Sequence, residues 1–233
     1  MDDIKIDIFK YLNYQNRGIY EQLSKVYEIQ LYLDTKLTSW VLDNDNPIIR
    51  TPKDNLDIPS FTHELLHLYI DYLGMTSKKY IFHDVLNVHV MISVKNDLFN
   101  HIYNLTCHKK MYPYFKSMGF SDVDFVQKSD SFFSQSDYIL IKLFKRLNIF
   151  PKFWISRFIG HTISLMNDVV EQRWDENRKN LSKLSKLDND LFNVIYQFDS
   201  KWSKQVSLDC TTNFDELCDG LLEWMTNNSI IKR

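Results

Sequence analysis

Glycine and proline are scarce in this chain, since each occurs only five times in 233 residues. Both residues mark tight turns, and an all-β sandwich needs a turn roughly every ten residues. Their scarcity excludes that class and favours helices joined by short connections. Hydrophobic residues make up 44% of the sequence, which is enough for a packed core in a chain of this length.

Cysteine is also sparse, and long apolar runs are missing. The three cysteines, Cys107, Cys210 and Cys218, form no Cys-x-x-Cys pair, so neither a disulfide framework nor a cysteine zinc knuckle is predicted. The first seven residues are acidic and lack the apolar segment of a signal peptide. No stretch approaches the roughly 20 apolar residues of a membrane span. We therefore expect a soluble cytoplasmic protein with reduced thiols and no membrane association.

Neither sign of charge dominates. The chain has 28 Lys and Arg residues against 30 Asp and Glu residues, for a formal net charge of -2. Such a balance provides no broad field that would attract nucleic acid or an anionic membrane. No nucleic-acid partner is indicated, and the oligomeric state is left undetermined.

The pattern of apolar residues predicts an α+β fold that is mostly α-helical. Residues 4–26 have apolar positions at helical spacing, so one or two helices are expected there. Residues 27–33 and 39–50 are rich in β-formers, and Asp43-Asn44-Asp45-Asn46-Pro47 is strong turn chemistry between two apolar pairs, so a small hairpin or sheet is predicted. Further helices are expected over residues 85–111 and 153–184, where breaks are allowed in both, and over residues 138–147, 188–202 and 214–225.

The chain is predicted to form a single domain over residues 1–233. Its core covers about residues 20–125, and a C-terminal helical extension covers about residues 130–233. No internal repeat or low-complexity linker separates them. The serine-rich stretch 129–136 is the best candidate for a joint between the two parts.

One short motif points to chemistry: His63-Glu64-Leu65-Leu66-His67. Two histidines four residues apart on a helix direct their rings to the same side, and neutral imidazole is a good ligand for Zn²⁺. Glu64 is adjacent to such a metal without having to bind it, so it can serve as the general base of a hydrolase. The motif is expected by chance roughly once in a hundred chains of this length.

The surrounding residues place the motif on a helix. Pro59-Ser60 is a typical helix start, with Ser60 as the predicted N-cap, and Gly74 is a typical C-terminal stop. A similar capping pattern, Asn213 with Glu216, predicts the start of the last helix. Leucine and aromatic residues on most sides of the motif helix predict that it lies at the centre of the domain.

These residues resemble a known family. The sequence from His63 to Leu68, preceded by the strand candidate Ile48-Ile49, resembles the active-site helix of zincin metallopeptidases. It is similar in particular to the small intracellular gluzincin-like domains of bacterial and phage regulators, where an edge strand runs beside the motif helix. The resemblance covers roughly residues 20–115. It implies a zincin-like core, a Zn²⁺ cofactor, a peptide or protein substrate, His63 and His67 as ligands, and Glu64 as general base.

A catalytic zinc needs a third protein ligand, and here the chain departs from the family. The extended histidine motif of metzincins is absent after His67. Gluzincins normally use a later glutamate, but no glutamate occurs between Glu64 and Glu171. A polar stripe offers substitutes on the segment that follows: Asp97, His101, Asn104 and His108. Among these His108 is the preferred third ligand, His101 is the first alternative and Asp97 the second.

Other residues around the motif have weaker interpretations. Asp71 and Asn104 are candidates to orient a ligand through a hydrogen bond. Tyr103 and Tyr112 are candidates to stabilise a developing oxyanion. A distal group, His161 with Asp168 and Glu171, is another possible source of a carboxylate ligand.

Two alternatives to a peptidase remain open at this stage. The histidines can be structural side chains of a buried helix, with their ring nitrogens bonded to neighbours. Alternatively, the chain is a non-catalytic, zinc-binding helical module for regulation or protein interaction, because a fold does not determine a function. A closed site of four ligands, for example His63, His67, His101 and His108, would indicate a structural metal, whereas three ligands would indicate catalysis.

Overall fold

The computed structural model describes residues 4–43, 47–53, 56–76, 78, 81, 88–95, 97–125 and 133–231. Most of these residues are helical, and the strands form one small mixed sheet. The predicted α+β, mostly α-helical fold is therefore confirmed. Parts of three predictions lie outside the described residues: the turn at 44–46, the start of the helix at 85–87 and the joint at 129–132.

The chain divides into two compact units. The first unit comprises residues 1–75 and 107–130, and the second comprises residues 76–106 and 131–233. One helix, α5 (Leu98–Ser117), contributes its N-terminal half to the second unit and its C-terminal half to the first. Among the described residues, no helix is both long and apolar enough to cross a membrane.

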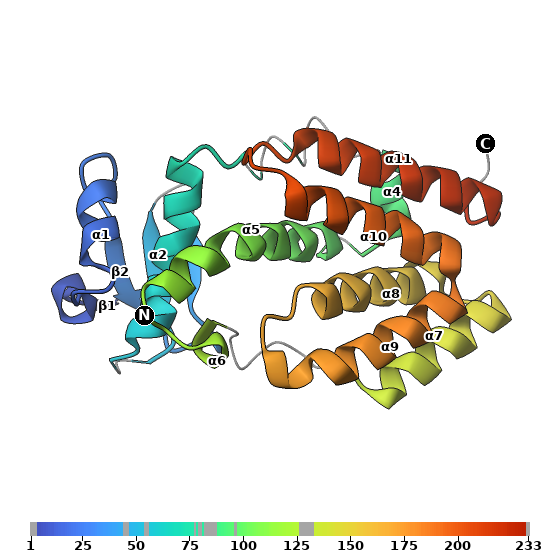
Figure 1. Ribbon diagram of the computed structural model, residues 1–233, viewed down its shortest axis with the longest axis horizontal. Coiled ribbons are helices and arrows are strands. Elements are labelled where there is room, and N and C mark those ends of the chain that lie inside the picture. Colours follow the sequence, from blue (N-terminus) through green and yellow to red (C-terminus); the bar gives the residue numbers. More distant parts are fainter. Residues whose placement is uncertain are drawn as a thin grey trace. The chain divides into compact units, whose positions relative to one another are not determined.

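The first unit combines the sheet with short N-terminal helices and the motif helix. Its strand order is β1-β2-β4-β3, with β2 and β4 parallel and the two outer pairs antiparallel. Leu31 of β2 lies opposite Ile49 of β4, and both are almost fully buried. The elements of this unit, shown in blue to green in Figure 1, are β1 (Ile4–Lys5), η1 (Ile8–Tyr11), α1 (Arg17–Leu23), β2 (Gln30–Leu33), β3 (Val41–Asp43), β4 (Ile48–Thr51), α2 (Ile58–Tyr72) and α6 (Asp122–Phe125).

Helix α2 carries the motif and is anchored at several points. Its apolar side chains share one buried core with side chains of the sheet, and Phe61 and Leu65 are fully buried there. The buried amide of Asn16 donates to the hydroxyl of Thr62 at 2.9 Å, next to the first motif histidine. This hydrogen bond links the N-terminal segment to the turn of α2 that positions the motif.

The ends of α2 correct one prediction and confirm another. Asp57, not Ser60, is the N-cap, because its carboxylate accepts from both the backbone N–H and the hydroxyl of Ser60. Gly74 ends the helix with φ of 103°, a left-handed conformation that favours glycine. The predicted stop is therefore confirmed, and Ser60 lies inside the first turn.

Helix α5 runs further than predicted. Residues 85–111 were expected to end before Tyr112-Pro113, but α5 continues through Pro113 to Ser117. A proline inside a helix costs about 3 kcal/mol, and the buried side chains of Met111 and Phe115 on either side of it offset that cost. The expected interruption is present, because α4 (Val88–Ser93) ends before α5 begins.

The second unit is a bundle of helices. Figure 1 shows its long helices running beside one another, and α10 contacts α8, α9 and α11. The prediction of Asn213 as a cap is wrong, because Cys210 occupies the N-cap of the last helix and Asn213 is buried inside it. The remaining elements of the unit are α7 (Gln135–Leu147), α8 (Pro151–Met166), η3 (Glu171–Arg173), α9 (Trp174–Leu187), α10 (Asn189–Lys204) and α11 (Thr211–Asn227).

A close approach between α10 and α11 allows a stability test. A Cβ atom on Gly220 would lie only 2.9 Å from Cγ1 of Val194. Alanine is favoured over glycine in a helix by about 1 kcal/mol, but overpacking of this kind costs about 1 to 3 kcal/mol. We expect Gly220→Ala to lower the free energy of unfolding by about 1 kcal/mol in urea titrations.

The matched control places the same change in a Val194→Ala background. There the clash is absent, so Gly220→Ala should be neutral or stabilising. Equal destabilisation in both backgrounds would contradict the packing argument.

Candidate metal centre

Three imidazole rings meet in the first unit. Two come from α2, where His63 and His67 are one turn apart, and the third is His108 on α5. One ligand nitrogen from each ring lies within 4.8 Å of the other two. Among the described residues, this is the group of histidine, cysteine and carboxylate side chains that can hold a metal ion.

The distances within the group are close to those of a metal site. Nε2 of His63 lies 3.0 Å from Nε2 of His108, and two nitrogens bound to one tetrahedral zinc lie about 3.3 Å apart. The ring centroid of His67 is 5.2 Å from each of the other two centroids. A hydrogen bond between two neutral imidazoles is enough to explain the distance between His63 and His108. It does not explain why a nitrogen of His67 also lies within 4.8 Å of the other two.

Burial keeps the central histidine in the form that binds metals. His63 is almost fully buried, and this burial lowers its pKa to about 4, while an interaction with the backbone of Phe125 opposes the shift. Nδ1 of His63 has no hydrogen bond of ordinary geometry to any described residue. The ring is therefore neutral near pH 7, with a lone pair available for a metal.

Glu64 belongs to the same helical turn as the two motif histidines. Its side chain is only 5% exposed, so this carboxyl group lies inside the unit and not on its surface. On an ideal helix Glu64 is displaced by about 60° from His67 and about 100° from His63. Glu64 is therefore next to the two motif histidines on the helix without being one of the three converging ligands.

An aromatic side chain covers the histidines. The ring of Phe125, on α6, lies 4.8 Å from the ring of His63 and 5.4 Å from that of His108. Helix α6 is held by Asp122, whose carboxylate accepts from the hydroxyl of Tyr112 at 2.7 Å and pairs with Lys116. Phe125 is buried and makes this side of the centre apolar.

Phe125 was not predicted from the sequence. Its helix does have a local signal, because Ser121 and Asp124 bond reciprocally in the manner of a capping box. That signal indicates a helix start but says nothing of which side chains the helix covers. Tyr112 was a candidate for oxyanion stabilisation, and its hydroxyl instead donates to Asp122.

The two alternative third ligands do not join the group. Asp97 and His101 are exposed, and His101 lies two turns before His108, or about 10 Å along the axis of α5. Nε2 of His101 lies 2.8 Å from the hydroxyl of Ser164 in the second unit. Tyr103 also bonds within that unit, to the backbone of Thr76. The structure therefore brings His108, and neither alternative, to the motif.

The distal group in the second unit does not converge either. His161 faces Asp137, with 3.7 Å between Nε2 and Oδ1. Asp168 accepts from the amide of Asn177 and pairs with Arg173, while Glu171 is exposed on η3. These side chains support the bundle and do not form a ligand set.

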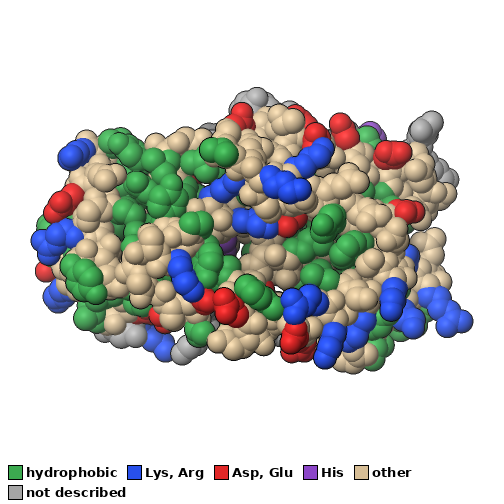
Figure 2. All heavy atoms as spheres, viewed as in Figure 1, with side chains coloured by type: hydrophobic (Ala, Val, Ile, Leu, Met, Phe, Trp, Pro, Cys, Tyr) green, Lys and Arg blue, Asp and Glu red, His purple; other side chains and the backbone are tan. Residues whose placement is uncertain are grey.

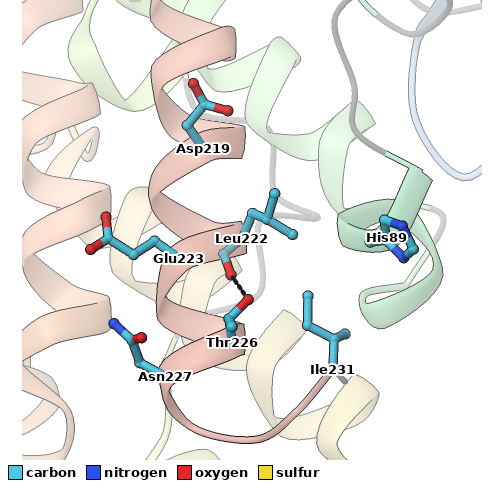
Figure 3. Close-up of a pocket in the computed structure, with 7 residues that line it drawn as sticks. All are labelled: His89, Asp219, Leu222, Glu223, Thr226, Asn227 and Ile231. Atoms are coloured by element: carbon cyan, nitrogen blue, oxygen red, sulfur yellow. Dashed lines mark hydrogen bonds between the residues drawn. The ribbon is translucent and has the colours of Figure 1, made fainter. Parts of the chain in front are cut away.

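A separate cavity of about 400 Å³ lies between α4 and α11 of the second unit. Its titratable side chains are His89, Asp219 and Glu223. Figure 3 shows Leu222 directed toward His89, while Glu223 projects to the other side of α11. The three groups therefore do not converge, and the cavity provides no second metal site.

Asp71 lies one turn beyond His67, and burial raises its pKa to about 6. As the pH rises above about 4, the unfolded chain loses this proton before the folded chain does. The ionised carboxyl therefore costs stability that grows from pH 4 to pH 6 and persists above. We expect Asp71→Asn to raise the free energy of unfolding by about 1 to 2 kcal/mol at pH 7, after allowance for partial exposure.

The same substitution should have little effect on stability near pH 3, which is below the pKa of the carboxyl in both the folded and the unfolded chain. Urea titrations at the two pH values measure the difference. A gain of equal size at both would show that the pKa shift is not its cause.

Comparisons of the chain with protein-family models, with curated proteins and with solved structures find no match. The assignment of the centre therefore rests on the convergence of its side chains.

Proposed function

We propose that this protein is a zinc-dependent metallopeptidase of the zincin type that cleaves a peptide or protein substrate in the cytoplasm. The convergence of His63, His67 and His108 carries the proposal, because it supplies the third ligand that the motif lacks. Three imidazoles suit zinc among the common metals. The small sheet before the motif helix agrees with the family resemblance.

The number of histidines favours catalysis over a structural metal. Structural zinc sites are closed by four protein ligands, whereas catalytic sites have three and leave one position for water or substrate. The fourth histidine considered, His101, is engaged with Ser164. A three-ligand centre beside a buried glutamate is the arrangement that hydrolysis requires.

Bound zinc supplies Lewis-acid chemistry: it polarises a carbonyl oxygen and makes water nucleophilic near neutral pH. The protein residues supply the rest. Glu64 accepts a proton from the attacking water and delivers it to the leaving amine. Phe125 and the burial of His63 exclude bulk water from one side, which strengthens electrostatic interactions within the centre.

Metal removal tests the proposal directly. The zinc-loaded protein should cleave members of a library of quenched fluorescent peptides, and a chelator should abolish the cleavage. Addition of zinc to the chelated protein should restore it. If zinc binds tightly and no peptide or unfolded protein is cleaved, the rival function as a non-catalytic zinc-binding module takes its place.

A further inference from the structure

Helix α7, in the second unit, leaves a row of apolar side chains uncovered. Ile139, Leu143 and Leu147 are four residues apart and therefore lie along one face of the helix. They are 54%, 44% and 54% exposed, whereas Ile141 on the opposite face is fully buried. The row forms a ridge about 12 Å long, of the kind that packs into the groove of another helix.

Another exposed apolar side chain lies in the turn between α7 and α8. Phe150 comes three residues after Leu147 and is 67% exposed, and its ring makes an edge contact with that of Phe144. Its φ is 48°, a left-handed conformation that is strained for a bulky residue. A small residue would form this turn at lower cost, so folding of the unit does not explain an exposed aromatic ring here.

Basic side chains run beside the apolar row. Lys142 and Arg146 are exposed and lie within about 60° of the row on an ideal helix. Neither makes an ion pair with a described residue. Their neighbour Lys145 differs, because it pairs with the buried Asp188. The α7 face, defined as Ile139, Lys142, Leu143, Arg146, Leu147 and Phe150, is therefore apolar along one line and basic along the next.

Figure 2 shows one face of the protein, on which hydrophobic side chains gather in a broad patch at the upper left and in smaller groups among charged side chains elsewhere. The α7 face differs from a plain apolar patch, because its apolar row lies beside two cations that make no ion pair with a described residue. It is independent of the metal centre, since none of its residues belongs to the first unit.

We propose that the α7 face binds an amphipathic helix of a partner protein, with an apolar row flanked by Glu or Asp. The acidic side chains of the partner would pair with Lys142 and Arg146 while its apolar row packs on the ridge. A second copy of this chain is disfavoured, because it would bring two basic rows together. A bilayer is disfavoured because the rest of α7 packs on α8, which leaves a row too narrow for insertion.

The test uses a synthetic helical peptide with leucines every three to four residues and an adjacent row of glutamates, labelled for fluorescence anisotropy. The full-length protein should bind it saturably. The same peptide with lysine in place of glutamate should bind at least tenfold more weakly, because it repels the basic row. Higher salt should weaken the acidic peptide only.

Two double variants test the two halves of the face. Lys142→Glu with Arg146→Glu should weaken binding of the acidic peptide about tenfold or more, and Leu143→Gln with Leu147→Gln should do the same. The matched controls Lys179→Glu and Val206→Gln, at exposed positions elsewhere in the second unit, should leave the affinity within about twofold of wild type.

Three outcomes would overturn the proposal: no binding of the acidic peptide, equal binding of the basic peptide, or insensitivity to both double variants. Sedimentation with phosphatidylserine vesicles that depends on the same residues, without peptide binding, would assign the face to a membrane instead. Metal content and peptide cleavage should be unchanged in all of these variants, so this proposal can fail without affecting the metallopeptidase.

Discussion

Replacing His108 with alanine is expected to remove the bound metal. The zinc-reconstituted wild-type protein should retain about one ion per chain after dialysis, because three imidazoles converge on one point. A structural zinc site contributes about 10 to 16 kcal/mol over four ligands, so loss of one ligand should weaken zinc binding by at least about 100-fold. Elemental analysis of the dialysed protein measures the difference, and His63→Ala and His67→Ala should behave in the same way.

The control for this result lies on the same helix. His101→Ala removes an identical side chain from α5, two turns earlier, and should leave the zinc content unchanged. Circular dichroism shows whether each variant keeps its helices. If His101→Ala lost the zinc and His108→Ala retained it, the third ligand would be His101 and not His108. A wild-type protein that binds no zinc after reconstitution would leave the three histidines as structural side chains.

Replacing Glu64 with glutamine is expected to abolish peptide hydrolysis while zinc binding persists. The amide has nearly the same size as the carboxyl but cannot accept the proton from the attacking water. General-base catalysis is worth about 10²-fold to 10⁴-fold, so the rate should fall by at least that factor in the quenched-peptide assay. Zinc content should stay at the wild-type value, because Glu64 is not one of the three converging ligands.

Glu21→Gln is the matched control for this variant. It makes the same change from carboxyl to amide at an exposed position on α1, in the same unit, and should retain hydrolysis within a fewfold of wild type. Equal activity of Glu64→Gln and the wild-type protein would refute the proposed role of Glu64. Loss of both zinc and activity in Glu64→Gln would show that Glu64 supports the metal and not the proton transfer.

The local elements of the fold follow from the sequence. The pattern of the apolar residues identified α7 and α10, and the β-rich pairs on either side of the turn that ends at Pro47 identified β3 and β4, because helices and strands impose different spacings on a buried face. The start and stop residues around the motif identified α2. The errors occurred at element ends. Ser60 and Asn213 are both good capping residues in isolation, but Asp57 and Cys210 occupy those positions.

The continuation of α5 through Pro113 has a similar origin. The local cost of a proline is visible in the sequence, but the burial of Met111 and Phe115 that offsets it depends on what packs against the helix. Tertiary packing therefore decided where this helix ends.

The candidate metal centre was likewise predicted in part from the sequence and in part only from the tertiary structure. The sequence by itself determined that His63, Glu64 and His67 share one helical turn, since their spacing matches the helical period. It left His108, His101 and Asp97 as candidates on one face of a later helix, because the helical period cannot distinguish positions on the same face. Only the tertiary structure decided among them, since the choice depends on which turn of α5 meets α2. The same is true of Phe125, which contacts His63 from a segment more than fifty residues further along the chain, a separation over which no local pattern carries information.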